Sequence, residues 1–238
     1  MSIPSCTNGF PLSDPTVLII DDHDLVATAI AMTLRSAGLQ ARRHIARSRE
    51  GVLLATATTS PGVALLDLDL GRDPDGTPID GTTLIEGLCR SGWRVLALSG
   101  TSDEARLGKA LAAGALAGIP KSAALPVLVT AVRRAAQGVE VMHPERRRQL
   151  VEAHQREQDR GRSLGLRLEK LSERERAVLD RLAQGRRAQA IAEEFVVSVT
   201  TVRTQIRAIL GKLKVGSQLE AVTMLFEYQR SAGARSRE

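Results

Sequence analysis

The chain has 238 residues, which suits two ordinary domains, each able to bury its own core. Only 2% of the residues are aromatic, which disfavours single-strand nucleic-acid binding, because that binding uses bases stacked on aromatic rings. Of the net charge of +6, none arises before residue 139: residues 14–138 carry 13 acidic and 13 basic side chains, whereas residues 139–238 carry 14 and 20. This asymmetry predicts a polyanionic partner for the C-terminal part.

Membrane insertion and secretion are not indicated. No apolar run approaches the roughly 20 residues that a membrane span needs, and residues 1–13 lack the pattern of a signal peptide and are expected to be a flexible tail. The cysteines, Cys6 and Cys89, share no short spacing, so neither a metal clip nor a disulfide framework is expected. We therefore expect a cytoplasmic protein without a membrane partner.

Strand and helix patterns alternate five times between residues 14 and 138. Apolar runs typical of buried strands occupy residues 17–20, 63–66, 95–98 and 115–119, residues 39–44 are expected to form a further strand, and helical spacing of apolar residues follows each of the five. Ser48 is expected to cap the second helix, and Thr101 with Glu104 to form a capping box for the fourth. Unbroken apolar strands predict an α/β fold: a five-stranded, doubly wound parallel sheet with helices on both faces.

Polar residues follow four of these strands, namely Asp21, Asp22, Asp67, Ser99 and Lys121. Ligand sites of doubly wound sheets lie beyond the carboxyl ends of the strands, so we expect these side chains in one crevice. Three carboxylates there repel one another unless a cation lies among them, and such oxygen ligands suit Mg²⁺. With that charge neutralised, an aspartate can attack a phosphoryl group. Each residue alone also suits a helix cap, a turn or a solvated surface, so the hypothesis depends on their occurring together.

The sequences VLIIDDHDLV, VALLDLDL, VLALSG and GIPKS resemble the motifs of response-regulator receiver domains. This resemblance implies a two-state switch in which Asp67 is the phosphoacceptor. It also implies that Ser99 is the switch hydroxyl and that Lys121 binds the phosphate.

The same resemblance implies bound Mg²⁺ and a histidine kinase as partner. Asp22 is expected to bind the ion directly and Asp21 through water, while Asp69 supplies its backbone carbonyl. The implied metal ligands are Asp21, Asp22, Asp67 and Asp69.

Three positions depart from the receiver pattern. The family usually has a proline where this chain has Gly71, and it reaches an Asp-Gly pair sooner than Asp80 and Gly81. GRDPDGTPID is therefore expected to be a loop insertion of about six residues beside the site, which costs little free energy in itself. Gly118 stands where the family places an aromatic residue that rotates inward on activation. The usual coupling between Ser99 and that residue cannot operate unchanged.

Residues 139–168 are expected to form a partly helical linker. The segment from Pro144 to Arg160 is polar and suits a solvated helix with proline in its first turn. Residues 161–165 are expected to be a flexible joint. The expected domains are residues 14–138 and 169–230, followed by a flexible tail over residues 231–238.

Four helices are predicted in the second domain. Ser172 with Glu175 forms a capping box for the first helix, and Ser217 with Glu220 forms one for the last. Between them, helices over residues 188–195 and 199–213 are joined by a tight turn. The second of these helices has an apolar stripe formed by Val202, Ile206, Ile209, Leu210 and Leu213.

Arg203, Thr204 and Arg207 lie off that stripe, as in a helix-turn-helix whose recognition helix enters the major groove. The structural alternative is a four-helix bundle with a basic outer face. LSERE, IAEEF, the S-x-x-T-V of residues 198–202 and KLKV resemble the LuxR-type output domain of NarL/FixJ response regulators. This resemblance implies that Arg203, Thr204 and Arg207 face the bases of double-stranded DNA, that Lys212 and Lys214 contact its backbone, and that the last helix pairs two protomers.

These features predict a DNA-binding response regulator that is not an enzyme, in which phosphorylation at Asp67 gates dimerisation and transcriptional control. One alternative keeps the DNA binding but makes it independent of phosphorylation or controlled by a ligand, because of Gly118 and the insertion. Another takes LLDLDLG as the motif of a haloacid-dehalogenase-like phosphatase, with Asp67 as nucleophile and Asp69 as general acid. That motif normally ends the first strand of its fold, whereas here two strands precede it.

Overall fold

The computed structural model describes residues 15–100 and 104–235 of the chain. The chain divides into two compact units, residues 1–154 and 155–238. The expected tail over residues 1–13 lies outside the described residues, as does Thr101 of the expected capping box. Among the helices that are described, none is long and apolar enough to cross a membrane.

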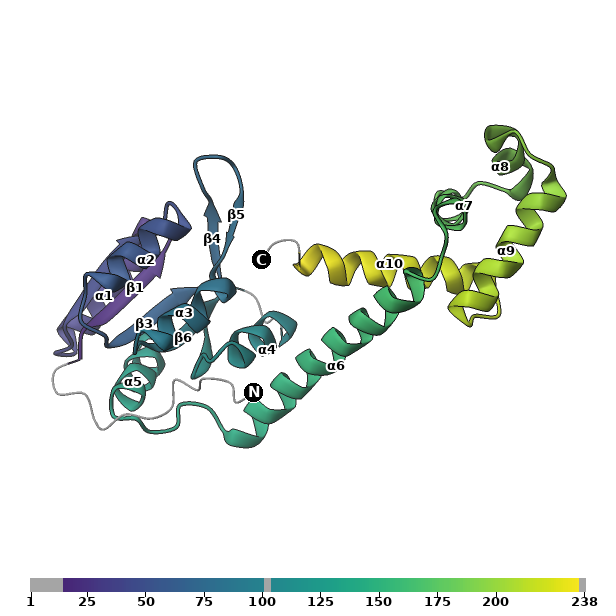
Figure 1. Cartoon of the computed structure of the whole chain (residues 1–238). Helices are drawn as coiled ribbons and strands as arrows, with labels where there is room; N and C mark the ends of the chain where they lie inside the picture. The colour runs from purple at the N-terminus through teal and green to yellow at the C-terminus, as the bar shows by residue number, and fades with distance from the viewer. Residues whose placement is uncertain (1–14, 101–103, 236–238) are drawn as a thin grey trace. The chain divides into compact units, whose positions relative to one another are not determined.

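A parallel sheet forms the centre of the first unit (Figure 1). Its strands are β1 (Val17–Asp21), β2 (Ala41–Ile45), β3 (Val63–Asp67), β6 (Arg94–Ser99) and β7 (Ala117–Pro120). They lie in the order β2-β1-β3-β6-β7, so the strand order reverses at β1, which lies between β2 and β3. The five-stranded, doubly wound sheet predicted from the sequence is confirmed.

Helices cover both faces of the sheet because successive strand residues point to opposite sides. Side chains such as Ile19 and Leu65 pack in one core with α1 (Asp24–Ser36) and α5 (Leu125–Ala136). Neighbouring residues such as Ile20 and Leu66 pack in a second core on the other face. The helices of that face are α2 (Arg49–Ala57), α3 (Ile85–Arg90), which follows the 3-10 turn η1 (Gly81–Leu84), and α4 (Glu104–Ala112).

Two local expectations have clear outcomes. Ser48 caps α2, accepting a hydrogen bond from the backbone N–H of Gly51 at 3.0 Å, as predicted. Cys89, on α3, is disulfide-bonded, although the spacing of the two cysteines indicates no disulfide framework. Spacing along the sequence could not predict this bond, because spacing carries no information on distance in space.

The segment expected to be an inserted loop forms a β-hairpin instead. Strands β4 (Asp69–Arg72) and β5 (Pro78–Asp80) pair antiparallel, and the hairpin projects from the sheet (Figure 1). The carboxylate of Asp73 accepts hydrogen bonds from two backbone N–H groups of the turn, at 2.8 and 3.0 Å. Leu70 and Ile79 are buried in the second core. With only these two buried positions, the polar segment shows little of the alternation that marks a strand.

The helix α6 (Pro144–Leu168) runs without a break through residues 161–165, where a flexible joint was expected. Gly165 lies against the ring of Tyr228, and a Cβ on that glycine would be 3.0 Å from Tyr228 Cε2. The small residue lets the last helix approach closely, and the ion pair between Arg160 and Glu227, at 2.8 Å, strengthens the contact. Packing against a neighbour therefore offsets the low helix propensity of glycine.

The second unit contains the four predicted helices: α7 (Glu173–Ala183), α8 (Ala188–Phe195), α9 (Val199–Leu213) and α10 (Gln218–Arg235). Their core includes Leu164 and Leu168 from α6. The capping box of Ser172 with Glu175 is present in both directions. Helix α10 extends to residue 235, into the segment expected to be a tail, and residues 236–238 lie outside the described residues.

Candidate functional site

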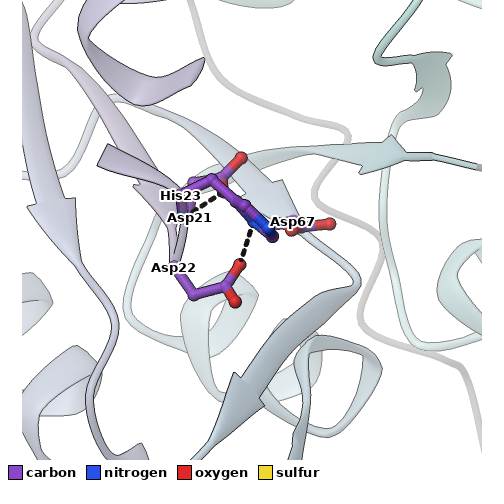
Figure 2. A group of neighbouring side chains, drawn as sticks. All are labelled: Asp21, Asp22, His23 and Asp67. Atoms are coloured by element: carbon purple, nitrogen blue, oxygen red, sulfur yellow. Dashed lines mark hydrogen bonds and ion pairs between the residues drawn. The ribbon is translucent and has the colours of Figure 1, made fainter. Parts of the chain in front are cut away.

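An acidic cluster lies where the strand order of the sheet reverses. Asp21 and Asp67 end the adjacent strands β1 and β3, and both are buried, with 0% and 2% of their surfaces exposed. Asp22 and His23 follow β1 and are more exposed. Figure 2 shows the four side chains together, and one ligand atom from each lies within 4.8 Å of the others. The cluster could hold a metal ion.

Lys121 follows β7 and brings a positive charge into this cluster. Its ammonium lies 2.8 Å from Asp21 Oδ2 and 2.6 Å from Asp67 Oδ2. Burial lowers the pKa of this ammonium, but its hydrogen bonds to Asp21 and Asp67 raise the pKa by more, so that it lies above its ordinary value. The lysine is therefore firmly charged.

The carboxyl group of Asp67 has a raised pKa. Burial is the largest cause, and it outweighs the opposing hydrogen bonds from Lys121 and from the backbone N–H of Asp69. The single ammonium thus does not fully compensate the removal of this carboxylate from water. A further cation would favour its ionised form.

A cavity of about 370 Å³ opens onto the cluster. Its lining includes five of the residues singled out in the sequence, namely Asp22, Asp67, Asp69, Ser99 and Lys121. The structure therefore gathers the residues expected in one crevice. The side chain of Asp69 is exposed, while its backbone N–H donates to Asp67 Oδ1 at 3.1 Å.

Three residues of this site were not identified from the sequence as site residues. The imidazole Nδ1 of His23 lies 2.7 Å from Asp22 Oδ1, as the dashed line in Figure 2 marks. Gly71 has a φ of +70°, and a Cβ there would be 2.7 Å from Asp22 Oδ2, which explains why a glycine is needed. Arg106, on α4, lines the same cavity. His23 could have been found from its place in DDHD, but Arg106 has no local motif.

The space beside Gly118 on β7 is occupied by the side chain of Leu107. A Cβ at this position would collide with the side chain of Leu107, which comes from α4. An inward-rotating aromatic residue therefore has no counterpart here. The departure noted in the sequence has a structural basis, since a leucine from another element fills the place.

The predicted helix-turn-helix consists of α8, a short turn and α9. Ser198 caps α9, accepting a hydrogen bond from the N–H of Thr201 at 3.1 Å. The turn contains Val196, whose φ of +54° lies in the left-handed region that β-branched residues rarely adopt. Helix α9 buries Val202, Ile206, Ile209 and Leu213. The predicted bounds of the recognition helix, residues 199–213, match α9.

The basic residues of α9 divide into two groups. Arg203, Thr204 and Arg207 are exposed on the face opposite its buried stripe, and Lys214 is exposed just after the helix. Lys212 is different, because its ammonium lies 2.6 Å from Glu175 Oε2 in the capping box of α7. This hydrogen bond from Lys212 is the largest cause of a lowered pKa for Glu175.

Comparison with known proteins assigns both units to families. Residues 17–133 match the response regulator receiver domain, and residues 169–225 match the bacterial regulatory proteins of the luxR family. The response regulator protein VraR of Staphylococcus aureus is 30% identical over 213 residues, which are 89% of this chain and 96% of that protein. The chain belongs to the response regulators with a LuxR-type output domain.

Other response regulators are similar over nearly the whole chain. A nitrate/nitrite response regulator protein homolog of Haemophilus influenzae is 28% identical over 217 residues, which cover 90% of this chain and 97% of that protein. Among solved structures, RcsB of Salmonella typhimurium is 22% identical, with a TM-score of 0.48 and coverage of 90% of this chain and 98% of that one. The chain is thus a two-component response regulator that combines a receiver with a DNA-binding domain.

Proposed function

We propose that Asp67 accepts the phosphoryl group in this response regulator and that its phosphorylation controls dimerisation and DNA binding. The observation that carries the proposal is the position of Asp67: it ends β3, is paired with Lys121 and lines a cavity. A carboxylate oxygen attacks the phosphorus atom of a phosphohistidine in a partner kinase. The P–N bond breaks as the acyl phosphate forms, and the released imidazole takes up a proton.

Two side chains would stabilise the transferred group. The ammonium of Lys121 is within hydrogen-bonding distance of Asp67 Oδ2 and can follow the charge onto a phosphoryl oxygen. The hydroxyl of Ser99, which lines the same cavity, can donate to a second oxygen. Both interactions are stronger with the phosphorylated aspartate than with the free one, because the phosphoryl group carries more negative charge.

The residues present fit Mg²⁺. Asp21, Asp22 and Asp67 supply three carboxylates against the one ammonium of Lys121, so a divalent cation balances the charge. The backbone carbonyl of Asp69 adds an uncharged oxygen of the kind that Mg²⁺ accepts. When bound, the ion supplies charge neutralisation to the phosphoryl oxygens.

For the output domain, we propose that Arg203, Thr204 and Arg207 contact base edges in the major groove, while Lys212 and Lys214 contact phosphates. The exposure of the first three on the free face of α9 supports this assignment. The expected domains are a receiver over residues 14–138, a linker over 139–168 and an output domain over 169–230. We further propose that the protein acts in the cytoplasm, with a histidine kinase as partner and as a homodimer on DNA.

One observation favours a second possibility, DNA binding that is independent of phosphorylation. The side chain of Leu107 fills the place beside Gly118, so the aromatic switch of the family is absent. A titration of a duplex selected from a random-sequence pool separates the two functions. The native protein and Asp67→Ala are compared with and without beryllofluoride. We expect tighter binding only for the native protein with beryllofluoride, whereas equal affinities in all four cases would exclude the phospho-switch.

A haloacid-dehalogenase-like phosphatase is the enzymatic alternative, and we propose that the chain does not turn over phosphomonoesters. The strand β3 that carries Asp67 is the third along the chain, whereas the phosphatase motif normally ends the first strand. The side chain of Asp69 is also exposed, so burial does not hold its carboxylate in place as a general acid. On incubation with p-nitrophenyl phosphate and Mg²⁺, the native protein should release no more product than the Asp69→Asn variant. Steady turnover that is lost in Asp69→Asn would support the phosphatase instead.

A further inference from the structure

Helix α4 contacts the phosphorylation site, strand β7 and the linker helix α6 through three successive residues. Arg106 lines the cavity at Asp67, Leu107 fills the place beside Gly118, and Gly108 lies against the linker helix α6. The phosphorylation site and the start of the linker are therefore in contact with the same short helix.

Arg106 is held at the edge of the cavity by groups next to the phosphoacceptor. Its guanidinium Nη2 donates to the carbonyl oxygen of Leu68, the residue after Asp67, at 2.5 Å. It also lies 3.6 Å from Asp80 Oδ1, at the end of the hairpin. A small movement would bring this guanidinium to a phosphoryl group on Asp67, because both line one cavity.

We propose that Arg106 binds the phosphoryl group of phosphorylated Asp67 and thereby couples the site to α4. This inference rests on the proposed function of Asp67. A guanidinium can bind two phosphoryl oxygens at once, and these hydrogen bonds to anionic oxygens are stronger than the one that Arg106 makes to the neutral carbonyl of Leu68. The carboxylate of Asp80 keeps a partner when the arginine moves, because Lys109 Nζ lies 3.1 Å from Asp80 Oδ2.

Leu107 gives this movement a mechanical consequence. Its side chain occupies the space that a side chain at position 118 would need, so α4 packs directly on β7. Residues 106 and 107 are consecutive on α4. If binding of the phosphoryl group by Arg106 shifts the backbone of this helix, Leu107 is displaced with it. Arg106 with Leu107 thus takes the role that an aromatic residue at position 118 cannot perform.

Gly108 connects α4 to the linker. A Cβ on Gly108 would lie 2.6 Å from the carbonyl oxygen of Leu150, so the backbones of α4 and α6 are in close contact. Arg147 of α6 donates to the carbonyl oxygens of Leu111 and Ala115, at 3.1 and 2.6 Å. Residues 144–154 should therefore respond when α4 shifts.

The test measures hydrogen exchange of residues 144–154 and DNA affinity in the full chain, with and without beryllofluoride. We expect beryllofluoride to change both in the native protein. When variants are compared at the same fraction of phosphorylated Asp67, measured by intact-mass spectrometry, the gain in DNA affinity of Arg106→Gln should fall from about tenfold or more to near onefold. Arg106→Lys, which keeps the charge, should recover part of the gain.

Arg90→Gln is the matched control, because it removes an arginine of α3 that pairs with Glu86 outside the cavity. It should behave as the native protein. A native response in Arg106→Gln at equal phosphorylation would overturn the inference. If the native protein does not respond to beryllofluoride, the proposed function is overturned as well. If the native protein responds and Arg106→Gln responds equally, only the role of Arg106 is overturned.

Discussion

The receiver and the output domain carry their functional charges in opposite ways. In the receiver, Asp21 and Asp67 are buried and share one ammonium, so the balance of charge there depends on what else is bound. In the output domain, Arg203 and Arg207 are exposed to solvent on α9. The charge of the buried site can therefore change when a group binds to it or is attached to it. The charge of the exposed face does not change, and only its accessibility to DNA can be altered. This difference is the reason why we propose that the receiver controls DNA binding.

The largest expected effect concerns the cation at the buried cluster. Asp22→Ala should lower the rate of phosphorylation by acetyl phosphate by about 100-fold or more, because it removes a ligand of the proposed Mg²⁺ ion that would neutralise the charge developing on the phosphoryl oxygens. Intact-mass spectrometry at fixed times measures this rate. Asp24→Ala is the control, since Asp24 is exposed on α1 and paired with Arg43. A rate unchanged by chelation of Mg²⁺ would contradict the role of the cluster.

The next effect concerns the exposed face. Arg203→Ala or Arg207→Ala should weaken binding to a selected duplex by roughly 1–3 kcal/mol, with little change on random DNA. The loss arises because an arginine makes paired hydrogen bonds with a guanine edge. Fluorescence anisotropy on both duplexes measures it. If specific and random DNA lose affinity equally, the arginines contact phosphates instead.

The turn of the helix-turn-helix should be open to stabilisation. Val196 has a left-handed backbone and an almost fully exposed side chain, so it gains little from burial. Val196→Asn should raise the free energy of unfolding by about 1 kcal/mol, because asparagine tolerates this conformation better than valine. Calorimetry of the full chain should show a higher transition temperature. A lower temperature would mean that the valine makes a contact that compensates its strain.

Lys212 and Lys214 provide a smaller, paired comparison. Each substitution by alanine should weaken binding to all duplexes alike and reduce the slope of log affinity against log salt by about one unit. Lys212 is also paired with Glu175, whereas Lys214 follows the helix and is exposed. Should only Lys214→Ala change the salt slope, Lys212 would serve the fold of the output domain rather than DNA.

The smallest effect is the pH dependence of the same pair. The pKa of Glu175 is lowered in the folded state, first by Lys212 and then by the N–H of Ser172. The unfolded chain therefore binds this proton more readily, so the contribution to stability is present near neutral pH and is lost as the pH falls through the lowered pKa. Glu175→Gln should flatten that part of the acid unfolding curve. An unchanged curve would show that the pair is unimportant for stability.

The sequence predicted elements whose cause is local. The spacing of apolar residues reports directly on burial, and it predicted α9 and the strands β1, β3, β6 and β7. The caps Ser48 and Ser172 were predicted because caps act over three residues. The acidic crevice followed from the rule that strand ends of a parallel sheet meet. In such a sheet, a polar residue at the end of a strand in the sequence is also close in space to the residues that end the neighbouring strands.

Features that depend on distant partners were missed. The helix continues through Gly165 because Tyr228 packs on it, 63 positions later in the sequence. Arg106 enters the cavity because of how α4 packs, not because of its neighbours in the chain. The pairing of Lys212 with Glu175 likewise depends on the contact between α7 and α9.

The burial of both faces of the sheet limits where this protein can vary in length. One extra residue inside β3 would exchange its side chains between the two cores, moving Leu65 and Leu66 to the wrong faces. In the turn between β4 and β5 no core residue depends on such a register, so added residues there cost little. The fold thus tolerates added length at the edge that carries its chemistry, which is where β4 and β5 lie.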